Sequence, residues 1–141
     1  MKRIYFLILG LLVLLTILGF FFSSVSLSGG QGDKFYSLKK NKNYETIIEL
    51  FDQKALKQQP VDLWIKVFES QNKKWGNLLS YKNTGFHTET LNGRKIAVLD
   101  YLVVYSNCSV KERISLIKRN SGYRIIMYEY YDSEAGMLSI K

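Results

Sequence analysis

Cysteine, histidine and proline each occur once in the 141 residues, and these scarcities exclude several kinds of protein. Because Cys108 has no possible partner, the chain cannot be a small disulfide-stabilised scaffold and must be held by a hydrophobic core. One histidine and one cysteine cannot build a usual zinc site, and Glu69, Glu89 and Asp132 do not have metal-ligand spacing. There is no GxGxxG sequence and no phosphate-binding loop. We therefore expect neither a metal nor a cofactor.

Acidic residues are also few, with 12 Asp and Glu against 20 Lys and Arg, which gives a formal charge of +8. Without Lys2 and Arg3 the balance is 18 against 12, or +6. This excess favours anionic neighbours such as lipid headgroups, acidic polysaccharide or an acidic partner protein. The basic residues form no stripe, and we expect no nucleic-acid binding. They are scattered in three groups, which we interpret as solvated surface: Lys39, Lys40 and Lys42; Lys73 and Lys74; and Lys118, Arg119 and Arg124.

Residues 4–22 form a long run without charge, in which Thr16 is the one polar side chain. At about 1.5 Å per residue, a helix of this length reaches roughly the 30 Å of a bilayer's hydrocarbon core. The sequence therefore predicts a membrane-spanning helix over residues 1–22, with its apolar part running from Ile4 through Leu12 to Phe22.

The charges on either side of this run predict its orientation. Lys2 and Arg3 precede it, and no charge follows until Asp33, so the N-terminus is expected in the cytoplasm and the rest of the chain outside it. The small residues at 24–26 leave a second possibility, a cleaved signal peptide and a secreted or periplasmic product. A signal peptide has an apolar region of about 7–15 residues, which is shorter than this run and favours an uncleaved anchor in the inner or cell membrane.

Small, uncharged residues follow at 23–32, SSVSLSGGQG, and predict a flexible tether before a domain over residues 33–141. Residues 33–56 then predict a helical hairpin with a break at 41–43, because the apolar residues of its second half have helical spacing: Tyr44, Ile47, Ile48 and Phe51. The only proline, Pro60, begins a further helix that ends at Gly76. Its two tryptophans, Trp64 and Trp75, have the spacing of core residues more than that of ligand-stacking residues.

From residue 78 the apolar period changes to two, and strands are predicted over 79–91, 94–106, 109–119 and 123–131. The turns between them are Asn92-Gly93, Asn107-Cys108 and Ser121-Gly122, and Asn-Gly is the strongest short hairpin signal. We interpret Cys108 as a turn residue without a chemical role. Helices followed by an antiparallel meander predict an α+β domain, with helices packed on a curved four-stranded sheet.

Several phrases together resemble a known family. They are FYSLKKNKNYETIIELFD, a tryptophan-bearing helix ending KKWGNLLSYK, NGRKIAVLDYLVVYSN, and VKERISLIKRNSGYRIIMYEY. The chain resembles the small exported bacterial domains of the nuclear transport factor two-like superfamily, which also contains ketosteroid isomerase-like proteins. The resemblance implies a cone-like fold in which a curved sheet wraps around helices. It does not transfer an activity, because the superfamily contains enzymes, binding modules and dimerisation domains.

Strand alternation sorts the side chains of the predicted sheet into two faces. The face expected toward the helices carries Phe86, Leu99, Tyr101, Val103, Ile114, Leu116, Ile125 and Met127. The outer face carries a polar group, His87, Glu89, Asp100, Arg113, Ser115 and Tyr128. His87, Asp100, Arg113 and Tyr128 are candidates for an acid/base cluster. The alternative, which we favour, is that Asp100 and Arg113 form a structural ion pair diagonally across the hairpin.

The same outer face also carries an apolar set that is too large for a fully solvated sheet and predicts a binding surface: Val98, Leu102, Val104, Ile117, Ile126, Tyr128 and Tyr130. The family resemblance implies pairing through this face, with a second copy or with an envelope protein. We therefore expect a non-catalytic, membrane-anchored binding or accessory domain. Two alternatives stay open, an isomerase-like enzyme using Asp100 or His87 in a cavity, and an envelope protein that binds anionic glycan or lipid.

Overall fold

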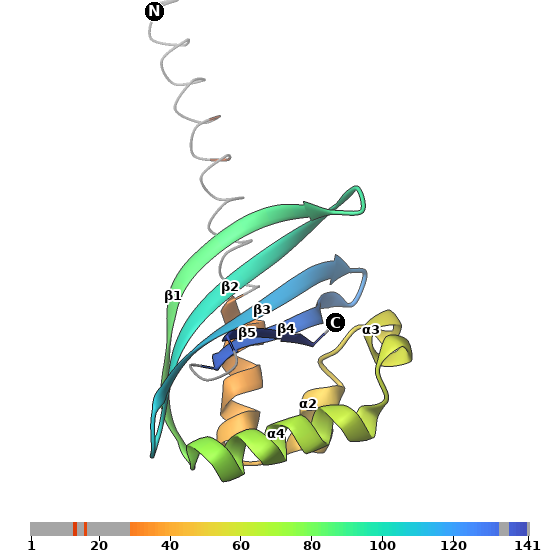
Figure 1. Cartoon of the computed structure of the whole chain (residues 1–141). Helices are drawn as coiled ribbons and strands as arrows, with labels where there is room; N and C mark the ends of the chain where they lie inside the picture. Colours follow the sequence, from red (N-terminus) through yellow and green to blue (C-terminus); the bar gives the residue numbers. More distant parts are fainter. Residues whose placement is uncertain (1–12, 14–15, 17–28, 133–135, 141) are drawn as a thin grey trace, which may run out of the picture.

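The computed structural model describes residues 13, 16, 29–132 and 136–140 (Figure 1). Of the predicted membrane span, this includes Val13 and Thr16, whose hydroxyl donates a hydrogen bond to the carbonyl oxygen of Val13. The rest of the span lies outside the described residues. Within the described residues, no helix has both the length and the apolar character needed to cross a membrane. The anchor therefore stays a prediction.

The chain is helical over residues 29–40, so the last four residues of the predicted tether, 29–32, belong to a helix instead. The tether was predicted from composition, but Gly32 has a packing role that composition does not reveal. A Cβ atom at Gly32 would lie 2.0 Å from the hydroxyl oxygen of Tyr101. Glycine is therefore needed for the close approach of this helix to the sheet.

The prediction that the second arm of the hairpin is one continuous helix is wrong. It divides into α2 (Tyr44–Ile48) and α3 (Gln53–Gln58). Between them Phe51 forms a parallel bridge with Ile125 in the sheet, and the Asp52 carboxylate accepts a hydrogen bond from the backbone N–H of Lys54 to cap α3. Ile47, Ile48 and Phe51 are nevertheless buried, as their spacing predicts.

The third predicted helix is confirmed as α4 (Val61–Trp75), which starts after Pro60 and ends at Gly76. Trp64 and Trp75 are buried core residues, and the helix presents Phe68 and Gln71 on the same side. Gly76 has a φ of +83°, a left-handed conformation that favours glycine.

All four predicted strands are present, as β1 (Leu78–Leu91), β2 (Arg94–Tyr105), β3 (Ser109–Arg119) and β4 (Gly122–Asp132). A fifth strand that the sequence reading did not predict, β5 (Gly136–Ile140), pairs antiparallel with β4. The sheet is an antiparallel meander in the order β1-β2-β3-β4-β5. The α+β class is confirmed, with one more strand than expected.

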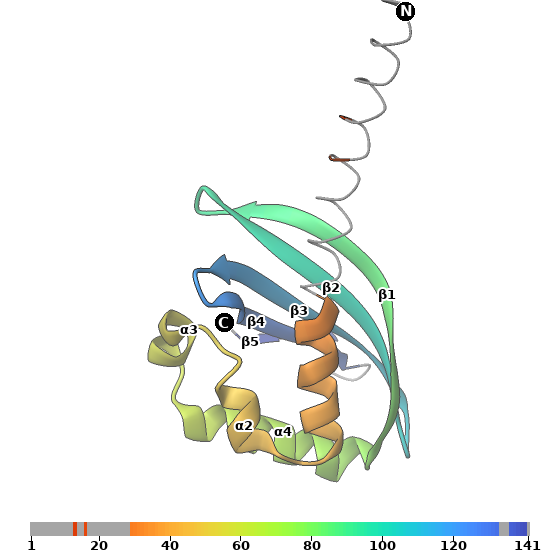
Figure 2. The same ribbon diagram turned by 180° about the vertical axis from the view of Figure 1, so that it is seen from behind.

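The helices lie on the concave side of the curved sheet (Figure 1). From the opposite side, the helix over residues 29–40, coloured orange, crosses the sheet beside α2 and α4 (Figure 2). Aromatic side chains fill the space between these layers and are fully buried: Phe35, Tyr36, Trp64, Phe68 and Tyr128. The domain is therefore held by one aromatic-rich core that helices and sheet share.

A bulge in β4 changes the predicted faces of this strand. Ser115 pairs with Met127, but the next residue, Leu116, pairs with Ile125, so Ile126 is an extra residue. One extra residue exchanges the faces beyond it. Tyr128 and Tyr130 therefore lie on the side of the helices, whereas Met127 lies opposite the outer-face residue Ser115. Our assignment of Tyr128 and Tyr130 to the outer face, and of Met127 to the inner face, is wrong.

Candidate functional site

A buried ion pair joins the helix over residues 29–40 to the sheet. The Lys39 ammonium donates to both carboxylate oxygens of Glu112, at 3.1 Å each, and to the Tyr128 hydroxyl at 2.6 Å. The Tyr105 hydroxyl donates to the same carboxylate, and the Tyr128 hydroxyl donates to the side-chain oxygen of Gln71. Lys39 and Glu112 are 4% and 2% exposed, so water does not screen their charges.

Aromatic rings surround the Lys39 ammonium, which lies 4.8 Å from the centre of the Tyr128 ring and 5.5 Å from that of Tyr105. Burial lowers the pKa of Lys39, and the Glu112 carboxylate opposes this shift. Burial, together with the negative charge of Glu112, raises the pKa of the Tyr105 and Tyr128 phenols and that of Tyr36. These phenols therefore stay neutral around a paired charge, and those of Tyr105 and Tyr128 donate hydrogen bonds.

The sequence reading missed this cluster and placed Lys39 on the solvated surface, which is wrong. The spacing of β3 contained the signal, because Val110, Glu112, Ile114 and Leu116 alternate onto one face and three of the four are apolar. A carboxylate on an apolar face requires a cation or donors. Helical spacing likewise places Lys39 one turn after Phe35 and Tyr36.

The predicted polar group on the outer face is present without Tyr128. The Arg113 Nε donates to the Asp100 carboxylate at 2.7 Å, and the two residues pair directly across β2 and β3, not diagonally. His87 lies 2.9 Å from Glu89 and 3.8 Å from Asp100, and 42% of its side chain is exposed. The Asp100–Arg113 ion pair is therefore confirmed, and it raises the pKa of Arg113.

The alternative in which Asp100 or His87 performs proton transfer requires these side chains in a cavity between helices and sheet, and the structure places them elsewhere. Both residues lie on the face of the sheet that is opposite the helices, since Asp100 follows the core residue Leu99 on β2. A site that faces water has no dry surroundings to tune an acid or a base.

The predicted apolar binding surface is smaller than expected. Val98 and Ile117 are buried and form a small cluster with Ile96, and Ile126 packs against it half-buried. Tyr128 and Tyr130 are on the other side of the sheet. Leu102 is exposed, at 38%, and Val104 is half-buried. The exposed apolar part of the predicted surface is therefore centred on Leu102.

A surface pocket of about 430 Å³ lies at this position. Asp100 and Arg113 line it, together with Leu102 and Lys111. An exposed leucine beside an ion pair and a further cation offers a partner both apolar contact and charge.

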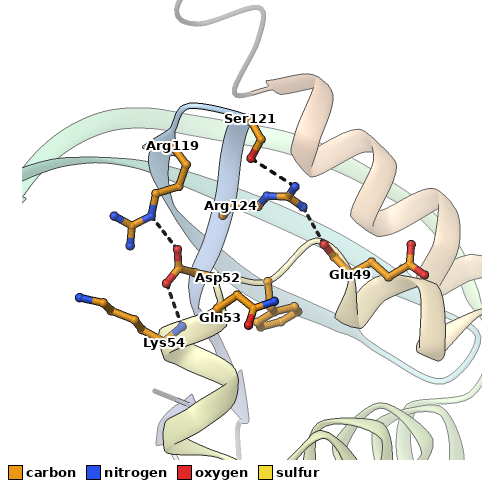
Figure 3. A pocket seen from close by; sticks show the side chains of 8 residues that line it. Glu49, Asp52, Gln53, Lys54, Arg119, Ser121 and Arg124 are labelled. Carbon is orange, nitrogen blue, oxygen red and sulfur yellow. Dashed lines mark hydrogen bonds and ion pairs between the residues drawn. The ribbon is translucent and has the colours of Figure 1, made fainter.

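Two further pockets adjoin each other at the β3–β4 turn and share Ser121 and Arg124 in their linings. We call them together the basic hollow. The first, of about 600 Å³, is also lined by Glu49, Asp52, Lys54 and Arg119 (Figure 3). The second, of about 320 Å³, is also lined by Gln31, Lys34 and Lys118, and none of the described residues that line it carries a carboxylate.

Among the described residues, no group of three or more His, Cys, Asp and Glu side chains could hold a metal ion. The chain's one histidine and one cysteine are also far apart. His87 pairs with Val98, whereas the half-buried Cys108 follows the end of β2 at Tyr105. Seven residues of strand separate these positions by roughly 20 Å. They do not form a cysteine–histidine pair.

Comparison with known proteins places the fold. No model of a protein family matches the sequence, and no curated protein matches it. Among solved structures, a proposed NTF2-like (nuclear transport factor two-like) transpeptidase from Campylobacter jejuni matches with a TM-score of 0.53 and 11% sequence identity. The match covers 70% of this chain and 95% of the other. At this identity the likeness shows the fold alone, and this chain shares the fold of that NTF2-like structure.

Proposed function

We propose that this chain is a membrane-anchored, extracytoplasmic binding domain that contacts a protein partner through the outer face of its sheet. The membrane part of the proposal rests on the uncharged run over residues 4–22 and on the basic residues before it. The binding part rests on the exposed Leu102 in a pocket beside the Asp100–Arg113 ion pair.

The observation that favours a binding domain over an enzyme is that aromatic side chains and a paired charge fill the interior. Trp64, Phe68 and Tyr128 are fully buried there, and the Lys39 and Glu112 charges are committed to each other. A general base needs a free carboxylate or imidazole within reach of a substrate proton. Glu112 is 2% exposed and already accepts hydrogen bonds from Lys39 and Tyr105.

The similar Campylobacter jejuni protein is described as a proposed transpeptidase. Acyl transfer through a cysteine requires a base close to the thiol. Because His87 and Cys108 are roughly 20 Å apart along the strand, the geometry supports binding better than cysteine-dependent acyl transfer in this chain.

Site-specific photo-crosslinking in membranes tests the proposal. A benzophenone amino acid at Leu102 in the tagged, full-length protein should give a discrete adduct after irradiation. The same group at Leu63 is the matched control, because Leu63 is a leucine of similar exposure on α4. An adduct of twice the chain mass would identify a second copy, and another mass would identify an envelope partner. Identical patterns at both positions, or no adduct at Leu102, would rule out binding through this face.

A further inference from the structure

The described residues that line the basic hollow carry an excess of cations. Five basic side chains line it, Lys34, Lys54, Lys118, Arg119 and Arg124, against the two acidic residues Glu49 and Asp52. Asp52 is 6% exposed and is already occupied, because it accepts from the Arg119 Nε at 2.7 Å and from the backbone N–H of Lys54. The charges of Asp52 and Arg119 therefore largely offset each other, and the excess comes from Lys34, Lys54, Lys118 and Arg124 against Glu49.

The Glu49 carboxylate does not pair with Arg124, which contacts the main chain of Glu49 instead. One terminal nitrogen of Arg124 donates to the Glu49 carbonyl oxygen at 2.7 Å, and the other approaches the Ser121 hydroxyl at 3.4 Å. Figure 3 shows the Glu49 carboxylate turned away from Arg124. The guanidinium group of Arg124 is thus held in place, and no acid among the described residues forms an ion pair with it.

Both arginines are oriented before any ligand arrives. The Nε of Arg119 is fixed on Asp52, and its two terminal nitrogens point away from that carboxylate, on the same side as the Lys54 side chain (Figure 3). A fixed guanidinium group loses less rotational freedom when it binds an anion than a free one does. Planar guanidinium groups match the oxygen spacing of phosphate. The geometry therefore suits a phosphate group.

The position of the hollow along the chain favours phosphate that belongs to a lipid. Gln31 and Lys34 line it and lie at the start of the helix over residues 29–40. The chain between Phe22, the end of the predicted span, and Gln31 can extend at most about 3.6 Å per residue, or roughly 30 Å in all. If residues 4–22 span the membrane, the hollow lies within this distance of the bilayer surface.

We propose that the basic hollow binds the phosphate of anionic lipid headgroups and so holds the domain against the membrane surface. This inference rests on the anchoring in the proposed function, and it assigns the hollow a role separate from that of the outer-face pocket. Lys34 and Lys118 line the part of the hollow without a carboxylate and are exposed, so they are the first cations that a headgroup meets.

The test measures energy transfer from a fluorophore on the domain to a labelled lipid. The full-length chain carries C108S and one new cysteine for the fluorophore, N120C, on the exposed turn beside the hollow. It is reconstituted into neutral phosphatidylcholine vesicles or into vesicles that also contain phosphatidylglycerol. Transfer should rise with phosphatidylglycerol and fall with added salt. In K34Q/K118Q, the lipid content for half-maximal transfer should increase on the order of tenfold.

The matched control is K66Q/K73Q, which removes two exposed lysines from α4 and leaves the hollow intact. An equal loss of energy transfer in both double variants would show that only the overall charge of the domain matters, and it would overturn the proposal. A fluorescence change with soluble glycerol phosphate, but none with phosphatidylglycerol, would assign the hollow to a free phosphate ester and also overturn it.

Flotation with neutral vesicles separates the two proposals. A chain that does not float with phosphatidylcholine would contradict anchoring. In that case flotation with phosphatidylglycerol vesicles becomes the test of the hollow, because binding should then require Lys34 and Lys118. If phosphatidylglycerol vesicles do not bind such a chain, the lipid proposal fails as well.

Discussion

Lys39 and Glu112 carry opposite charges inside an aromatic core, where each depends on the other. Taking a charge out of water costs several kcal/mol, and here the partner charge and the Tyr105 and Tyr128 hydroxyls offset this cost. Such a pair contributes little net stability compared with apolar residues of the same size, but the loss of one partner is severe.

The first prediction follows from this asymmetry. Glu112→Gln leaves the Lys39 ammonium buried without its counter-charge and should lower the free energy of unfolding by about 3–5 kcal/mol. Lys39→Met combined with Glu112→Gln removes both charges and should recover a large part of this loss. Urea denaturation of both variants measures the difference. A double variant no more stable than Glu112→Gln alone would contradict the interpretation of the pair.

Asp52 gives a prediction that depends on pH. The hydrogen bond from Arg119 lowers the pKa of Asp52 below its ordinary value of 3.8, so the folded state holds the carboxylate charged when the unfolded state begins to take up protons. The stabilisation is therefore complete above the unfolded-state pKa and is lost as the pH falls through the lowered, folded-state pKa.

Asp52→Asn isolates this charge, because asparagine also caps a helix well and keeps an acceptor for the backbone N–H of Lys54. Near pH 7 the substitution should cost about 0.5–1 kcal/mol, since Arg119 is partly exposed. Below about pH 4 the difference from the natural chain should shrink. Urea denaturation at several pH values checks this, and a difference that does not vary with pH would contradict it.

At the scale of elements, α4 must end at Gly76 for the next strand to start in place. A Cβ atom there would lie 1.9 Å from the Ser106 hydroxyl, whereas one at Gly93 would meet nothing within 4 Å. The two glycines have similar φ values, +83° and +74°. Gly76 also has a ψ of −165°, which places it in a region that is essentially restricted to glycine.

Gly76→Ala should therefore destabilise the domain by about 1–3 kcal/mol more than Gly93→Ala, because both variants strain the backbone but the first also creates a clash. Ser106→Ala added to Gly76→Ala should restore part of the loss. Thermal unfolding of the three variants measures this order. Equal effects of the two single substitutions would show that the left-handed backbone alone requires Gly76.

The strands show what sequence patterns can and cannot predict. Period-two alternation and the Asn92-Gly93 turn predicted four strands, because both signals are local. The bulge at Ile126 has no local signature, since an isoleucine fits either face of a strand, and it reversed the predicted positions of Tyr128 and Tyr130. Alternation on β3 could have identified Glu112 as buried, but its partner Lys39 lies 73 residues away.

At the scale of the whole molecule, the position relative to the membrane decides what the chain can meet. The proposed orientation predicts that the N-terminus and the domain lie on opposite sides. In a C108S background, a cysteine at Lys73 on α4 should react with a membrane-impermeant maleimide in intact cells, whereas one at Lys2 should not. Labelling at Lys2 but not at Lys73 would reverse the topology, and labelling at neither would place the domain in the cytoplasm.

The hairpin of β1 and β2 has a further consequence for the molecule. Among the described residues, its tip beyond Ile96 pairs only within itself, because β3 meets β2 no further than Ile96 and Ile117. Two strands without helix cover are marginally stable in water. Backbone amides at Thr90 and Lys95 should therefore exchange with deuterium by local opening, while those of Ile114 and Ile125 exchange only when the whole domain unfolds. The tip can change shape on contact without loosening the core.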